Sequence, residues 1–86
     1  MQIIKISAMW CPSCIIVNKF WNDVKNENKE IDFTDLDLDM DEEKVKKYSV
    51  GNILPVVIMS NGTNEVKRLI GEKTKEEYIN FIKGGL

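Results

Sequence analysis

Trp10-Cys11-Pro12-Ser13-Cys14 is the most informative stretch of the sequence, because it joins a short β-branched run to an amphipathic helical pattern. It holds both cysteines of the 86-residue chain, separated by two residues. Two thiols with this spacing at a helix N-terminus can close a small disulfide. The helix dipole and the free backbone N–H groups there favour a thiolate on the first sulfur. The pattern therefore indicates a pair of thiols that cycles between dithiol and disulfide.

The residues on either side of this motif predict a strand and then a helix. Ile3, Ile4 and Ile6 predict a central strand that is buried on both faces. Pro12 suits the first helical turn, where its missing N–H is not needed, and the polar residues 26–30 end the helix. The apolar stripe of this helix comprises Ile16, Val17, Phe20, Trp21 and Val24.

Residues 31–39 alternate between apolar and acidic side chains, which predicts a strand near a sheet edge with one apolar face. Its apolar residues are Phe33, Leu36 and Leu38. Asp41-Glu42-Glu43 then begins a short helix whose acids lie near its positive end. Val45 and Tyr48 are expected to face the core.

The last third of the chain predicts a hairpin and a final helix. Pro55 begins a strand that runs to Met59, and Asn61-Gly62 predicts the turn to a strand through Val66, Leu69 and Ile70. Gly71 ends that strand, and Thr74-Lys75-Glu76-Glu77 forms a capping box for a helix that carries Tyr78, Ile79 and Ile82. The predicted order is β-α-β-α-β-β-α, in a single α/β domain over residues 1–86.

Composition excludes several classes of function. The net charge of −2 and a single arginine, Arg68, speak against a nucleic-acid partner. The apolar runs are too short to cross a membrane. The first residues predict a strand rather than a signal peptide, so we expect a monomeric cytoplasmic protein. In that reducing compartment a cycling disulfide is favoured over a structural one.

Together the motifs resemble the thioredoxin family over nearly the whole chain. The resemblance rests on Trp-Cys-x-x-Cys at a strand-to-helix turn, on Pro55 at the third strand, on Asn61-Gly62, and on Gly-x-x-Thr-Lys from Gly71. It implies a minimal thioredoxin fold, with a four-stranded mixed sheet flanked by helices. The chain lacks the extra N-terminal strand and helix of full-length thioredoxins. The Pro12-Ser13 pair matches neither the usual thioredoxin pair nor the usual glutaredoxin pair.

The resemblance also implies roles for individual residues. Cys11 is the nucleophile that forms a mixed disulfide, and Cys14 is the residue that resolves it. Pro55 corresponds to the family's cis-proline, and the backbone of the Ile53-Leu54 segment pairs with the substrate chain. The docking surface around Cys11 comprises Trp10, Leu54, Pro55 and Gly71.

Lys5 departs from the family pattern. Thioredoxins usually carry a buried aspartate six residues before the first cysteine, with a lysine on the next strand; here the two positions are Lys5 and Asp35. We therefore hypothesise a charge-swapped buried ion pair, whose ammonium favours the Cys14 thiolate. The alternative is that Lys5 extends its stem across the sheet and keeps its amine in solvent.

The implied function is a thiol–disulfide oxidoreductase that reduces protein disulfides and is recharged by a thioredoxin-reductase-like enzyme or by glutathione. Its only redox group is the Cys11–Cys14 disulfide, with no bound cofactor. One alternative is a glutathione-dependent, glutaredoxin-like reductase. Pro12, directly after the first cysteine, favours this alternative. The residues Leu54 and Gly71 oppose it, because they depart from the motifs of glutaredoxins. Another is a thioredoxin-fold binding or iron–sulfur module. A zinc site within one chain needs about four ligands, and the chain has no histidine and no third cysteine.

Overall fold

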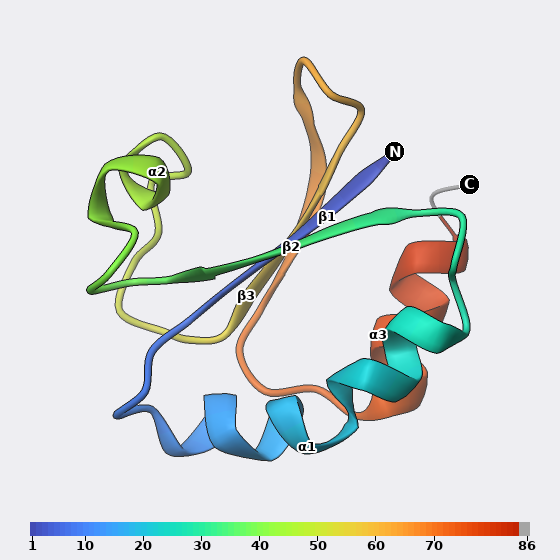
Figure 1. Ribbon diagram of the computed structural model, residues 1–86, viewed down its shortest axis with the longest axis horizontal. Helices are drawn as coiled ribbons and strands as arrows, with labels where there is room; N and C mark the ends of the chain where they lie inside the picture. Colours follow the sequence, from blue (N-terminus) through green and yellow to red (C-terminus); the bar gives the residue numbers. More distant parts are fainter. Residues whose placement is uncertain (85–86) are drawn as a thin grey trace.

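The computed structural model describes residues 1–84 and contains the seven elements in the predicted order (Figure 1). The strands are β1 (Gln2–Ser7), β2 (Asp32–Asp37), β3 (Val56–Ser60) and β4 (Glu65–Ile70). The helices are α1 (Pro12–Asn26), α2 (Glu42–Lys46) and α3 (Lys75–Lys83).

The strands form one mixed sheet in the order β2-β1-β3-β4. β1 is parallel to β2, and β3 is antiparallel to both β1 and β4. β2 therefore lies at an edge, as the sequence predicts, while β1 and β3 are central. Because β1 and β2 are parallel, the segments that follow both strands leave the sheet at the same end, which is where the cysteine motif begins.

Helices cover both faces of the sheet, which confirms the predicted α/β architecture (Figure 1). α1 and α3 pack on one face, where Trp21 and Tyr78 are buried against β1 and β3. α2 lies on the other face, where Val45 packs against Ile6 and Leu36. The two cysteines belong to this second cluster, so the redox motif lies at the end of the sheet where α1 begins.

Three details differ from the sequence prediction. β2 has apolar residues on both faces: Phe33 packs on the α1–α3 side and Leu36 on the α2 side, because they are three residues apart in a period-two strand. Ile16 of α1 is 44% exposed, so the buried stripe of α1 is narrower than predicted. Val66 and Ile70 are each 50% exposed, since α2 packs on β2 at the opposite edge of the sheet.

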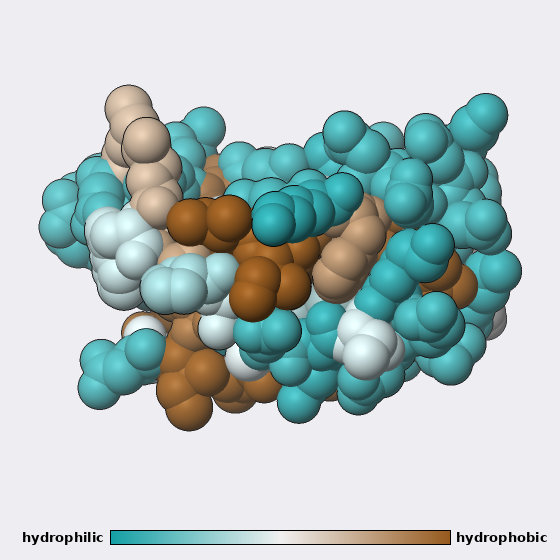
Figure 2. Space-filling view, turned by 90° about the horizontal axis from the view of Figure 1, so that it is seen from below, coloured by the Kyte–Doolittle hydropathy of each residue, from teal (hydrophilic) through white to brown (hydrophobic). Residues whose placement is uncertain are grey.

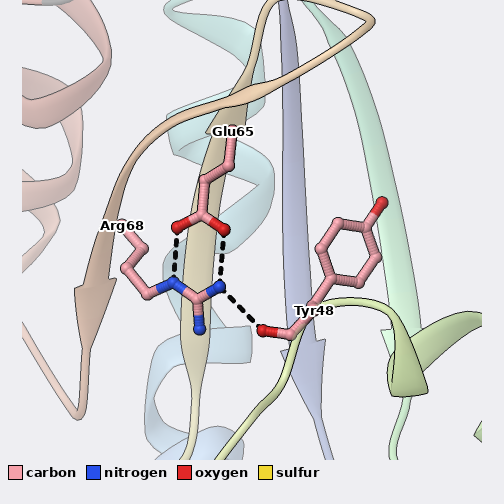
Figure 3. A network of polar contacts seen from close by, with 3 residues as sticks. All are labelled: Tyr48, Glu65 and Arg68. Atoms are coloured by element: carbon pink, nitrogen blue, oxygen red, sulfur yellow. Dashed lines mark hydrogen bonds and ion pairs between the residues drawn. The ribbon is translucent and has the colours of Figure 1, made fainter.

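An arginine network ties the segment before Pro55 to the sheet (Figure 3). The Arg68 guanidinium donates two hydrogen bonds to the Glu65 carboxylate and one, of 2.7 Å, to the backbone oxygen of Tyr48. The charged hydrogen bonds from Arg68 lower the pKa of Glu65. Edge strand β4 thereby holds the start of the loop that leads from α2 to Leu54 and Pro55.

The predicted end of β4 and the predicted start of α3 are both found. Gly71 has φ +94°, a backbone conformation that glycine adopts without strain, and the strand ends there. The Thr74 hydroxyl accepts from the backbone N–H of Glu77, and the Glu77 carboxylate accepts from that of Thr74. The capping box therefore begins α3 as predicted.

Candidate functional site

Cys11 is the N-cap of α1. Its sulfur accepts a hydrogen bond of 3.2 Å from the backbone N–H of Cys14, and its own N–H donates to the Ala8 carbonyl. Pro12 occupies the first helical turn, as predicted. An N–H donor and the positive end of the helix dipole both face the Cys11 sulfur, and both favour negative charge on it.

Cys14 lies one helical turn further on and is completely buried, whereas Cys11 is 6% exposed. Burial raises the pKa of the Cys14 thiol to about 11, and its hydrogen bond to Cys11 acts in the same direction. The positive charge of Lys5 opposes this shift but is outweighed. Both thiols are free in the structure. The inner sulfur is therefore held protonated while the outer one is available to react.

The loop before β3 lies against the outer sulfur. The Leu54-Pro55 peptide bond is cis, and the Cys11 thiol contacts the Leu54 backbone oxygen at 3.9 Å. The backbone N–H of Gly71 donates to the Pro55 oxygen at 2.9 Å. Ile53 is 61% exposed and lies beside Gly71. The structure thus brings the predicted docking residues together around Cys11.

Exposed apolar side chains also lie in the segments that follow β1 and β2, and we call them the apolar rim. Trp10 is 62% exposed, and its indole N–H donates to the Asp39 carboxylate at 2.8 Å. Met9 and Met40 are 79% and 78% exposed. Figure 2 shows hydrophobic residues gathered on the face of the molecule that carries α1. Pro12 is exposed and Ser13 half-buried at the same end of the helix.

Lys5 does not make the predicted pair. Its Cα lies opposite that of Asp35 in the β1–β2 register, but its ammonium donates to the Asn18 side-chain oxygen and lies 5.2 Å from the centre of the Trp21 ring. Asp35 instead forms an exposed ion pair with Lys25 at 2.9 Å. The predicted buried ion pair between Lys5 and Asp35 is therefore wrong, because Lys25 of α1 binds the Asp35 carboxylate instead.

The alternative of a solvent-exposed amine is also wrong, since Lys5 is only 4% exposed. Burial lowers the pKa of this lysine, while the charge of Asp35 acts to raise it. The Lys5 side chain is thus buried beneath α1. It faces the side of that helix that carries Cys14 and, four residues later, Asn18.

Three contacts escaped the sequence prediction. Asn18 holds Lys5, Asp39 holds Trp10, and the Tyr78 hydroxyl donates to the Gly71 oxygen at 3.0 Å. Burial raises the pKa of Tyr78 to about 12. Helical spacing from Cys14 could have indicated Asn18, but no local pattern connects Asp39 with Trp10 across 29 residues.

Neither a metal site nor a membrane span was found among residues 1–84. No three histidine, cysteine or acidic side chains of this part of the chain are grouped closely enough to hold a metal ion. None of its helices combines the length and the apolar character that crossing a membrane requires.

The sheet order and the position of the dithiol define the class: this is a thioredoxin-fold domain with a cysteine pair of the redox type. Comparison of the sequence with protein families then gives the family itself. Residues 1–84 match the family Thioredoxin, and the chain belongs to it.

Individual relatives are distant. Thioredoxin H2 of Arabidopsis thaliana is 26% identical over 74 residues, which are 86% of this chain and 55% of that protein. A thioredoxin of Chlamydia pneumoniae is 25% identical over 80 residues, 93% of this chain and 78% of that one. The chain therefore spans about half the length of the first relative and about three quarters of the second.

Solved structures show the same fold. A malaria-parasite thioredoxin-2 has a TM-score of 0.86 at 23% identity, covering 96% of this chain and 81% of its own. Plasmodium falciparum thioredoxin has a TM-score of 0.88 at 19% identity, covering 99% and 81%.

Proposed function

We propose that this chain is a thiol–disulfide oxidoreductase that reduces protein disulfides through a Cys11/Cys14 dithiol cycle. The observation that carries the proposal is the unequal surroundings of the two sulfurs. The outer sulfur accepts a backbone N–H at the helix cap, and the inner one is buried with its pKa raised to about 11. Membership in the thioredoxin family supports the same class of reaction.

In the first step the Cys11 thiolate attacks a substrate disulfide. A bond forms between Cys11 and one substrate sulfur, the substrate S–S bond breaks, and the departing sulfur leaves as a thiolate that takes a proton. The helix-cap N–H groups stabilise the attacking anion.

In the second step Cys14 resolves the mixed disulfide. It gives up its proton and attacks the Cys11 sulfur; the internal disulfide forms, and the electron pair leaves on the second substrate sulfur, which is protonated. The substrate has then gained two electrons and two protons. Lys5 lies on the side of α1 where its charge eases the loss of the Cys14 proton.

The exposed backbone and side chains around Cys11 serve as the docking surface. An extended substrate segment pairs with the Ile53-Leu54 backbone beside Pro55 and Gly71. The 3.9 Å contact between Cys11 and the Leu54 oxygen supports this, because it places that edge of the chain directly beside the reactive sulfur. Trp10, which precedes Cys11 in the chain, contributes an exposed aromatic surface.

The oxidised protein is recharged by a thioredoxin-reductase-like enzyme. A solved structure of similar fold, 17% identical, is described as a complex of ferredoxin:thioredoxin reductase with thioredoxin f2, which illustrates such a partner. We place the protein in the cytoplasm as a monomer that contributes to redox homeostasis and electron transport.

The test is insulin reduction with two recycling systems, NADPH with thioredoxin reductase and glutathione with glutathione reductase. Sustained reduction with the first is the expected result. Reduction with glutathione alone would favour the glutaredoxin-like alternative, and reduction with neither system would contradict the proposal when dithiothreitol also fails to support turnover.

A further inference from the structure

The surface next to Trp10 is apolar at its centre and acidic on one side. Residues 30–43 contain eight acidic side chains and no basic one. Because β1 and β2 are parallel, the acids that follow β2 lie at the same end of the sheet as Cys11, whereas those before β2 lie at the far end. The charge of this segment is thus split between the redox end and the remote end.

The acids at the redox end adjoin exposed apolar residues directly. Asp39 contacts the Trp10 indole at 2.8 Å. Together with Met40, Glu42 and Lys44, it also lines a hollow of about 360 Å³. Neither Asp39 nor Glu42 forms an ion pair with any of residues 1–84. No direct ion pair therefore neutralises either carboxylate, so both charges can act on an approaching molecule, although Lys44 lines the same hollow.

The exposed apolar side chains there need a partner that tolerates these carboxylates. Met9, Trp10 and Met40 are each more than 60% exposed. A partner that covers them also brings its own neighbouring residues against Asp39 and Glu42. An acidic residue there would be repelled, whereas a lysine or arginine can lay its aliphatic stem on the apolar side chains and its charge near the carboxylates.

We propose that this surface, formed by Met9, Trp10, Asp39, Met40 and Glu42, docks a lysine or arginine carried beside the reactive cysteine of the partner protein. The inference rests on the proposed disulfide-reducing function and adds a substrate class to it: disulfides with a basic flank. Complementary charge of this kind raises the rate of association and discriminates against acidic partners.

The test measures the first step alone, in a Cys14→Ser variant. Three short peptides carry one cysteine as a mixed disulfide with thionitrobenzoate and differ only in the two flanking residues: lysine, glutamine or glutamate. The release of thionitrobenzoate gives the rate constant, which is divided by that of dithiothreitol with the same peptide to remove intrinsic differences in reactivity. We expect the lysine peptide to react about tenfold faster than the glutamate peptide at low salt, with a smaller ratio at about 0.5 M salt.

Two charge variants localise the effect. Asp39→Asn with Glu42→Gln should bring the ratio close to one, while the asparagine oxygen can still accept the Trp10 hydrogen bond. The matched control, Glu30→Gln with Asp32→Asn, makes the same change in net charge at the remote end and should leave the ratio unchanged.

The outcomes separate this inference from the function on which it rests. Equal normalised rates for the three peptides would overturn the basic-flank preference and leave the reductase function intact. An equal fall of the ratio in the control variant would also overturn it, because the effect would then follow net charge alone. Failure of all three peptides to react would instead contradict the proposed function.

Discussion

The two cysteines are three positions apart and both buried, but their surroundings differ. Cys11 sits at a helix cap, beside an N–H donor and an exposed apolar rim. Cys14 is completely buried, and its nearest source of positive charge is the ammonium of Lys5, itself buried. In the proposed cycle, the unequal surroundings of two chemically identical thiols determine which of them reacts first.

Backbone groups dominate the surroundings of the Cys11 sulfur, whereas side chains dominate those of the Cys14 sulfur. Peptide dipoles that any sequence forming this helix would supply face the Cys11 sulfur. Burial is the main cause of the raised pKa of Cys14, and Lys5, held in place by Asn18 and the Trp21 ring, acts against that shift. Substitutions should therefore alter the inner site more easily than the outer one.

The largest expected effect comes from exchanging either sulfur for oxygen. Cys11→Ser should abolish insulin reduction, by roughly a thousandfold or more, because the nucleophile is lost. Cys14→Ser should allow one attack and then accumulate the mixed disulfide, visible by mass spectrometry. Full turnover in either variant would contradict the assigned roles.

The two tryptophans offer a second comparison of inside and outside. Trp21 packs edge-on against Tyr78 and Phe33, with ring centres 5.4 Å and 6.0 Å apart. Trp21→Ala should therefore lower the free energy of unfolding by about 3–5 kcal/mol. Trp10→Ala should lower it by about 0.5 kcal/mol or less and impair substrate reduction instead. Urea denaturation of both variants checks this, and equal losses would contradict it.

Alkaline pH should reveal the buried thiol. The pKa of Cys14 is raised in the folded protein from about 9 to about 11, so its contribution to stability is complete below pH 9 and is lost as pH rises toward 11. The full loss should be about 3 kcal/mol, because the pKa values of the unfolded and folded states differ by about two and each unit corresponds to about 1.4 kcal/mol.

Denaturation of the reduced protein between pH 8 and about 11.5 measures this loss. Cys14→Ala should remove it, and Tyr78→Phe separates the contribution of the tyrosine, whose pKa is raised to about 12. If the free energy of unfolding depended on pH in the same way in the unsubstituted reduced protein and in Cys14→Ala, burial would not raise the pKa of Cys14.

Lys5→Met should separate stability from function. Replacing a buried charge with an apolar side chain of similar length is expected to leave stability unchanged or raise it by about 1–4 kcal/mol. The resolving step should move to higher pH and slow by about tenfold for each unit by which the pKa of Cys14 rises.

The measurement is the lifetime of the mixed disulfide against pH. The matched control is Lys25→Met, which removes the exposed pair with Asp35 and should change stability by about 1 kcal/mol or less. An unaltered pH profile in Lys5→Met would rule out an influence of Lys5 on Cys14.

The sequence predicted best those features that local patterns determine. The helix cap at Cys11, the strand end at Gly71 and the box at Thr74 each depend on a few neighbouring residues, and the strand order followed from the family resemblance. The faces of β2 were misjudged because Phe33 and Leu36 differ by an odd number of residues. The partners of Lys5 were misjudged because they depend on where α1 lies over the sheet, and sequence separation does not show that Lys25 reaches Asp35 first.

The most direct test of the division between the two sulfurs is competitive alkylation of the reduced protein. Iodoacetamide is added at pH 7 in less than stoichiometric amount, and the modified cysteine is located by peptide mass spectrometry, with urea-unfolded protein as the control. We expect modification of Cys11 almost alone in the folded protein and of both cysteines equally in urea. Equal modification in the folded protein, or a preference for Cys14, would contradict it.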